Sequence, residues 1–236
     1  MGRSSSPPFP CTATTPAMPW RCNGHTLAGS QSSSLSTRTI PRWPMSSPTG
    51  RKRRETVGIR IMLTKEANRD PNDPGIDRIL RAAVRHEFPV NILCWGNLDA
   101  GTALVDRHPD TRFIIDHLGI IQPRTPPAPP QPWADLPKVL ELARRPNAVI
   151  KVSGACTLSR EPYPFPDIWD PLARVFDAWG FDRCLWGTDW TRAFAVVNYE
   201  QAVEPFLKTD RLSNSERAML MGGACAKAYG WSPKKG

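Results

Sequence analysis

The sequence lacks any run of about 18 apolar residues, so nothing in it predicts a membrane-spanning helix. It also lacks the continuous apolar segment near the N-terminus that a secretory signal requires. The six cysteines show no C-x-x-C or zinc-finger spacing, and Cys94, Cys156 and Cys184 lie in apolar runs where a reduced thiol packs as a small hydrophobe. These absences argue against a membrane protein and a disulfide-rich secreted protein, and they favour a cytoplasmic location.

Acidic residues are almost missing from the first 56 positions, where Glu55 stands against eight lysines and arginines. The formal net charge of +9 therefore comes mainly from this leader, and the rest of the chain is nearly balanced. A basic chain suggests a nucleic-acid partner, but a charge confined to the leader argues against one for the folded part. The leader is also rich in serine and proline and has no hydrophobic period, so we expect residues 1–56 to be disordered.

From Val57 onward, short apolar runs alternate with helical patterns, which predicts a second unit over residues 57–236. Strands are expected at 58–63, 89–96, 113–117, 148–154 and 184–189, and helices at 75–87, 98–105, 136–143, 169–179, 199–208 and 214–229. Strands this apolar have no face for water, so the alternation predicts an α/β fold with a parallel sheet. Right-handed crossovers would place the C-terminal ends of all five strands on one edge.

Two of the expected strands lead to chemically active side chains. The apolar run 113–115 is followed by Asp116 and His117, and the run 184–186 is followed shortly by Asp189. Because α/β proteins keep their chemistry at the C-terminal ends of their strands, we predict that His117 and Asp189 face a common hollow as a catalytic pair. Asp116 should alternate to the other side of its strand, so we expect it to dock a helix or to support the site from behind rather than to catalyse.

The same edge offers candidates for substrate binding. Trp95 and Trp190 stand at strand exits, where we expect them to line a pocket for a planar substrate. Lys151 can reach a substrate anion, although a lysine in a strand more often extends its amine to water. Ser153 lacks a nucleophile-elbow pattern, so covalent catalysis is not expected there.

Three stretches in this order resemble the amidohydrolase-related family (amidohydrolase 2): Asp-His-Leu-Gly at 116–119, Lys-Val-Ser-Gly at 151–154 and Trp-Gly-Thr-Asp-Trp at 186–190. The chain is most similar to the family's branch of TIM-barrel metal-dependent hydrolases and lactonases, over about residues 57–233. The resemblance implies a partial (β/α)8 barrel whose five strands are the fourth to the eighth. It also implies hydrolysis of a lactone or related cyclic carboxylate ester, with Asp189 activating water and His117 polarising the carbonyl or binding a metal.

The sequence departs from the family's pattern at the metal site, because the His-x-His pair of the first strand is missing. The resemblance implies one divalent metal, zinc or manganese, held by His117 and Asp189, or none at all. A hydrolytic zinc site needs about three protein ligands, and the sequence offers only these two. In family members that work without a metal, an arginine after the fourth strand binds substrate carboxylates, and Arg60 is the nearest match.

The resemblance implies three further strands before Val57, but residues 1–56 show no alternation of apolar strands and helices. Our hypothesis is therefore that residues 1–56 are a misassigned translation. An open barrel fragment would then be impaired in activity. Two other functions stay open at this point. One is a decarboxylase within the same family, and the other is a non-catalytic fragment or interaction protein whose basic leader binds an acidic partner.

Overall fold

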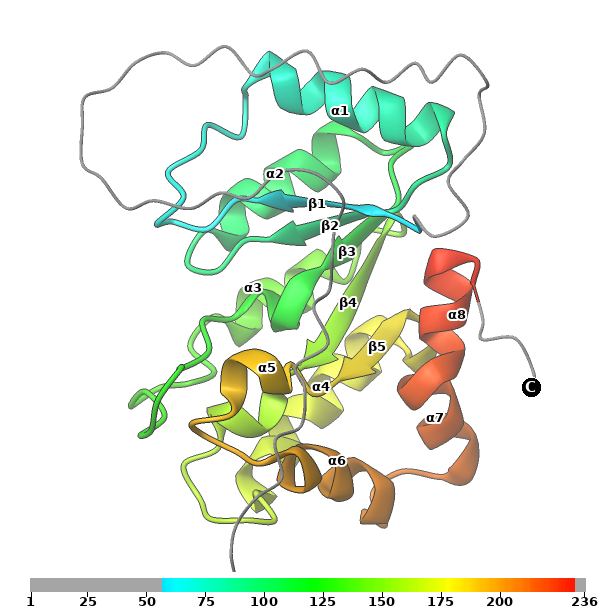
Figure 1. The fold of residues 1–236 in the computed structure, drawn as a ribbon. Coiled ribbons are helices and arrows are strands. Elements are labelled where there is room, and N and C mark those ends of the chain that lie inside the picture. The colour runs from blue at the N-terminus through cyan, green and yellow to red at the C-terminus, as the bar shows by residue number, and fades with distance from the viewer. Residues whose placement is uncertain (1–56, 232–236) are drawn as a thin grey trace, which may run out of the picture. The chain divides into compact units, whose positions relative to one another are not determined.

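The computed structural model of the protein describes residues 57–231, and the expectations for the leader, residues 1–56, lie outside that range. The described residues form a sheet of five parallel strands in the order β1-β2-β3-β4-β5 (Figure 1). The strands are β1 (Ile59–Met62), β2 (Val90–Leu93), β3 (Phe113–Ile115), β4 (Ala148–Ser153) and β5 (Cys184–Gly187). Parallel strands that neighbour one another in chain order are the arrangement of a (β/α)8 barrel, so the expected α/β fold with part of a barrel is confirmed.

Helices follow the strands as expected. They are α1 (Pro74–Arg85), α2 (Leu98–Arg107), α3 (Leu136–Leu142), α4 (Trp169–Trp179), α5 (Trp190–Ala193), α6 (Tyr199–Lys208), α7 (Asn214–Ala218) and α8 (Ala224–Tyr229). The expected helix at 214–229 consists of α7 and α8 joined by a π turn at Met219–Gly223, and the short helix α5 was not expected. In the described part of the chain, none of these helices has the length and apolar character needed to cross a membrane.

Local signals set several helix starts. Asp73 accepts a hydrogen bond from the backbone N–H of Gly75 at 2.7 Å and so caps α1. Reciprocal capping boxes start the two later helices, Asn198 with Gln201 for α6 and Ser213 with Glu216 for α7. Such boxes satisfy backbone donors that the first turn of a helix leaves free.

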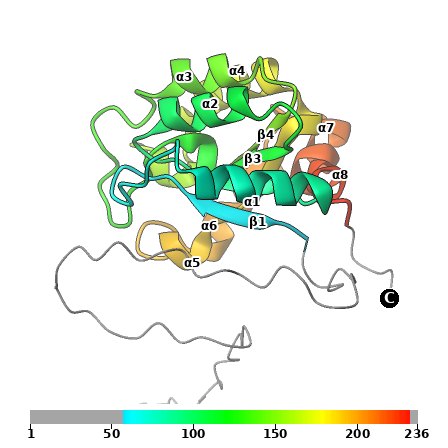
Figure 2. The same ribbon diagram turned by 90° about the horizontal axis from the view of Figure 1, so that it is seen from above.

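Helices α1 to α4 cover one face of the sheet (Figures 1 and 2). Facing them is a row of register partners, Ile61, Ile92, Ile115 and Ile150, which Cys184 completes on β5. None of the five is more than 4% exposed. Burying a side chain of this size contributes roughly 1.5–3 kcal/mol, so this row explains why the strands form one sheet.

The opposite face of the sheet carries polar side chains. Arg60 and Asn91 are register partners there, and Lys151 lies further along the same face on β4. Helix α8 packs on part of this face, where Ala224 joins Ile114 and Leu185 in a small apolar cluster. Beside it is an open cavity of about 330 Å³, lined by Arg60, Asn91, Lys151, Tyr229 and residues 57–59.

All five strands end earlier than the sequence suggested, and at two of them the difference concerns the predicted catalytic residues. The expected strand 113–117 ends at Ile115, and the expected strand 184–189 ends at Gly187. Beyond these ends His117 and Asp189 both have φ of 51°, in the left-handed region that a strand cannot continue. The extension of both strands through these residues was wrong, because an apolar run reports burial and not the turn that follows it.

Candidate active site

A tight left-handed turn after β3 positions His117. His117, Leu118 and Gly119 have φ of 51°, 61° and 67°, so three successive residues are left-handed. At Gly119 the left-handed backbone and a Cβ atom that would lie 2.6 Å from Leu98 Cδ1 both disfavour a side chain, so this position favours glycine. The turn folds back after the strand and buries His117, which is 8% exposed.

Asp189 lies at the end of β5, immediately before α5. Its Oδ2 is 3.4 Å from Nδ1 of His117, and the side chains of Asp189 and His117 are 14% and 11% exposed. The structure therefore brings together the two residues that the sequence singled out, from the loops that follow β3 and β5, the two neighbours of β4 in the sheet. Their catalytic roles stay a prediction.

The neighbours of His117 assign its tautomer. Arg60 Nη2 lies 3.5 Å from His117 Nε2, and a guanidinium only donates, so Nε2 is the acceptor and Nδ1 carries the hydrogen. Nδ1 then donates to Ser153 Oγ at 2.7 Å. Ser153 and Asp189 thus face the same ring nitrogen, whereas a serine–histidine–aspartate triad uses both nitrogens. A proton relay from Ser153 through His117 to Asp189 does not fit this geometry.

Burial lowers the pKa of His117 below its ordinary value, because a charged imidazole loses its hydration there. The carboxylates of Asp189 and Asp116 act in the opposite direction, and the guanidiniums of Arg60 and Arg192 reinforce the lowering. The balance leaves the ring neutral near pH 7, the form that can accept a hydrogen bond.

Asp116 is fully buried and holds two of the predicted substrate-binding residues. Its Oδ2 accepts from Arg60 Nε at 2.6 Å, and its Oδ1 lies 2.9 Å from Lys151 Nζ. Burial alone would lower the pKa of Lys151, but the charge of Asp116, aided by Tyr229, outweighs it and raises that pKa. Arg60 and Lys151 remain 46% and 25% exposed at their side chains and border the open cavity, so they are placed to meet an anion.

The two tryptophans predicted to line a pocket lie differently. The ring of Trp95 is 5.5 Å from the ring of His117, so Trp95 belongs to the site. Trp190 is 39% exposed and packs edge-on against Tyr199 at 6.1 Å. Trp190 follows Asp189 in the chain, but its ring packs against the first residue of α6.

Two residues of the site, Arg192 and Gln122, were not predicted from the sequence. Arg192 donates through Nε to Asp189 Oδ2 at 2.5 Å and through Nη2 to Gln122 Oε1 at 2.7 Å. Gln122 is 3% exposed and donates to the backbone oxygen of Ser153 at 2.8 Å. The three-residue spacing of Asp189 and Arg192 could have been recognised as a helical ion pair, but nothing in the sequence pointed to Gln122.

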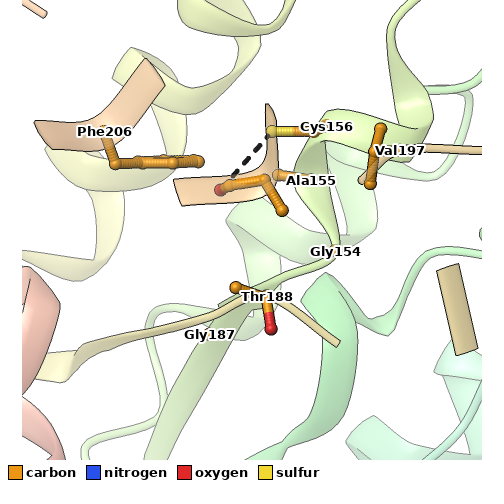
Figure 3. Close-up of a pocket in the computed structure, with 8 residues that line it drawn as sticks. Gly154, Ala155, Cys156, Gly187, Thr188, Val197 and Phe206 are labelled. Carbon is orange, nitrogen blue, oxygen red and sulfur yellow. Dashed lines mark hydrogen bonds between the residues drawn. The ribbon is translucent and has the colours of Figure 1, made fainter. Parts of the chain in front are cut away.

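A narrow crevice lies beside the pair, between the ends of β4 and β5 and helix α6 (Figure 3). Gly154, Gly187 and Thr188 line one side of it, and Cys156 and Phe206 another. Burial raises the pKa of the Cys156 thiol to about 12. Because the thiolate is the reactive form, Cys156 is a packing residue and not a nucleophile.

The described residues do not fit a hydrolytic metal site. Within residues 57–231, no three His, Cys, Asp or Glu side chains are grouped to hold an ion. The two predicted ligands, His117 and Asp189, are instead flanked by the guanidiniums of Arg60 and Arg192. A zinc ion needs about three protein ligands, and neighbouring positive charges oppose its binding.

Comparison with known proteins gives the family. The amidohydrolase family model matches residues 41–231, and so begins upstream of Val57. The L-fucono-1,5-lactonase of Burkholderia ambifaria is 30% identical over 187 residues, which cover 73% of this chain and 60% of that protein. The 4-sulfomuconolactone hydrolase of Hydrogenophaga intermedia is 28% identical over 142 residues, covering 59% of this chain and 45% of that protein.

Solved structures agree with this fold. The crystal structure of an amidohydrolase from Burkholderia multivorans with bound zinc has a TM-score of 0.64 and 24% sequence identity, and the match covers 74% of this chain and 64% of that one. The chain thus spans about half to two thirds of the length of the relatives it matches. On the strength of the family match over most of its length, this chain belongs to the amidohydrolase family.

Proposed function

We propose that this protein hydrolyses a lactone or a related cyclic carboxylate ester. The observation that carries the proposal is the approach of Asp189 Oδ2 to His117 Nδ1, 3.4 Å apart at the exits of β5 and β3. A carboxylate beside a neutral imidazole is the pair that general-base hydrolysis of an ester needs. Two relatives are named for lactone hydrolysis, which supports this substrate class for a chain of the same family.

Asp189 is the general base of the proposed reaction. Arg192 occupies its Oδ2, so Oδ1 is the oxygen that takes a proton from the attacking water. The water oxygen bonds to the carbonyl carbon, and the ring C–O bond then breaks. Asp189 returns the proton to the leaving alkoxide, and the product is a hydroxy acid. His117 stays neutral and keeps its Nδ1–H directed at Ser153 and Asp189.

Positive charge for the developing oxyanion comes from Arg60, whose Nη2 lies 3.5 Å from His117 Nε2, and Lys151 borders the same open cavity as Arg60 on the polar face of the sheet. Fixed cations of this kind stabilise an oxyanion more than they stabilise a neutral carbonyl. The same two side chains suit a substrate that carries a carboxylate, and the ring of Trp95 offers an apolar surface beside His117. Trp190, exposed next to Asp189, completes the predicted substrate-binding set.

No step of the proposed hydrolysis uses a metal ion. A relative was crystallised with zinc, but the donors of residues 57–231 are too few and too close to arginines to hold an ion by themselves. Zinc or manganese would therefore require ligands from outside this range. Activity that survives exhaustive chelation agrees with the metal-free route.

A panel of aldono-1,5-lactones and muconolactones, followed by acid release in a weakly buffered indicator assay, tests the function. Asp189→Asn should lower turnover by at least about 100-fold, as expected for loss of a general base. Asparagine tolerates left-handed backbone, so the φ of 51° at this position is kept. Asp182→Asn is the control. It removes an exposed carboxylate that pairs with Lys227 just before β5, and the turnover rate should stay that of wild type.

Three results would count against the proposal. They are wild-type protein inert toward every lactone, equal turnover by Asp189→Asn and wild type, and release of CO2 from aromatic acids in place of lactone hydrolysis. The last would favour the decarboxylase reading. Polyanion binding that disappears when residues 1–54 are deleted, without any turnover, would favour the interaction protein.

A further inference from the structure

One guanidinium ties together loops that follow three different strands. Arg192 lies on α5 with a side chain only 13% exposed. It donates to Asp189 Oδ2 after β5, and to Gln122 Oε1 and the Pro123 oxygen, at 2.7 and 2.9 Å, after β3. Its guanidinium also lies 5.1 Å from the ring centre of Trp95, after β2.

Gln122 extends the same hydrogen-bond network to the loop that follows β4. Its amide nitrogen donates to the backbone oxygens of Ser153 at 2.8 Å and His117 at 3.4 Å, while its Oε1 accepts from Arg192. Gly154 gives this amide its space, because a Cβ there would lie 2.2 Å from Gln122 Oε1. The backbone at Gly154 is also left-handed, with φ of 67°.

We propose that Arg192 and Gln122 together are the positioning unit of the His117–Asp189 pair. Arg192 fixes the Asp189 carboxylate by holding Oδ2, and this directs Oδ1 toward the water. Gln122 fixes the loop of His117 against the end of β4. Neither residue touches the reacting atoms, so both act through the pair. The catalytic part of this inference rests on the proposed function.

Contacts of this kind differ from an ordinary ion pair between neighbours on a helix. An exposed pair three residues apart is screened by water and contributes little. Arg192 is largely buried and its donors form charge-assisted bonds in a fixed fork, which set both distance and direction. Displacement of a reacting group by about 1 Å is enough to lower a rate about 100-fold.

Steady-state kinetics test whether Arg192 positions the His117–Asp189 pair. Arg192→Ala and Arg192→Lys are compared with wild type on the lactone that wild type hydrolyses. We expect kcat of Arg192→Ala to fall about 100-fold with KM changed less than about threefold, and Arg192→Lys to retain an intermediate rate. Millimolar guanidinium should restore part of the activity of Arg192→Ala but none of Asp189→Asn. Arg144→Ala is the matched control, because Arg144 pairs with Glu141 at the same spacing but is 77% exposed.

Hydrogen exchange measured by mass spectrometry tests the unit without any turnover. Arg192→Ala and Gln122→Met should both speed exchange in segments 117–123 and 153–157, whereas Arg144→Ala should leave these segments unchanged. Wild-type exchange in both variants would overturn the proposal, and so would a kcat loss that guanidinium does not restore. If wild type hydrolyses no lactone, the proposed function fails, and the exchange result alone decides whether Arg192 and Gln122 hold the loops.

Discussion

Asp116→Asn tests how much the buried ion cluster contributes to stability. Asp116 is 0% exposed, and its two oxygens face Arg60 Nε at 2.6 Å and Lys151 Nζ at 2.9 Å. Asparagine keeps the shape of the side chain but removes the negative charge. Two cations then remain beside a neutral amide, one of them mostly withdrawn from water.

The expected loss follows from the exposure of the two cations. Removing one partner of a fully buried pair costs about 3–5 kcal/mol. Arg60 is 46% exposed and can regain water, whereas Lys151 is 25% exposed and regains less, so the cost is reduced to about 2–3 kcal/mol. At about 2–4 °C per kcal/mol for a chain of this size, Tm should fall by about 4–12 °C.

Urea unfolding followed by circular dichroism measures the difference, with Asp99→Asn as the control. Asp99 Oδ2 is also 2.6 Å from an amine, that of Lys138, but Asp99 is 78% exposed. The control should lose less than about 1 kcal/mol. Equal losses in the two variants would refute the argument, because burial is what separates the pairs. Asp116→Asn/Lys151→Met should lose less than Asp116→Asn alone, because no unpaired ammonium remains.

Two further predictions concern the turn after β3. Because burial lowers the pKa of His117 below its ordinary value of 6.5, the unfolded chain takes up that proton first as the pH falls. The free energy of unfolding should therefore decrease below about pH 6.5, by at most about 1.4 kcal/mol per pH unit. Unfolding titrations of wild type and His117→Gln between pH 7 and 5 should show this extra slope in wild type alone, and parallel slopes would contradict it. Gly119→Ala should lose about 1–3 kcal/mol through its left-handed φ and the clash with Leu98, whereas Gly222→Ala, whose Cβ would meet nothing within 4 Å, should be nearly neutral in the same unfolding assay.

The architecture could be predicted because hydrophobic periodicity and crossover handedness constrain it strongly. A strand buried on its helix-covered face must place an apolar residue there at every second position, as Val90 and Ile92 do on β2 and Phe113 and Ile115 do on β3. Parallel strands joined by right-handed crossovers then align their C-terminal ends. That rule alone placed His117 and Asp189 on the same edge, and the structure brings them within 3.4 Å.

The finer geometry of the site could not be predicted, for two physical reasons. Left-handed backbone at His117 and Asp189 is imposed by the packing around the turns, since neither residue type requires it. The contact of Arg192 with Gln122 joins residues 70 positions apart, and its formation depends on loop paths that no local pattern encodes. Asp116 was expected in a supporting role, but its two cationic partners lie on strands distant in sequence.

The polar face of the sheet imposes a condition on anything that packs against it. Arg60, Asn91 and Lys151 point to that side, while helices α1 to α4 seal the other with hydrocarbon. An apolar segment packed on the polar face would remove water from the Lys151 ammonium and the Arg60 guanidinium, which have only the Asp116 carboxylate as a shared counter-charge. A segment that packs stably on the polar face must therefore enclose water or contribute anionic groups of its own. The charges of Arg60 and Lys151 thus restrict which segments can bury this face.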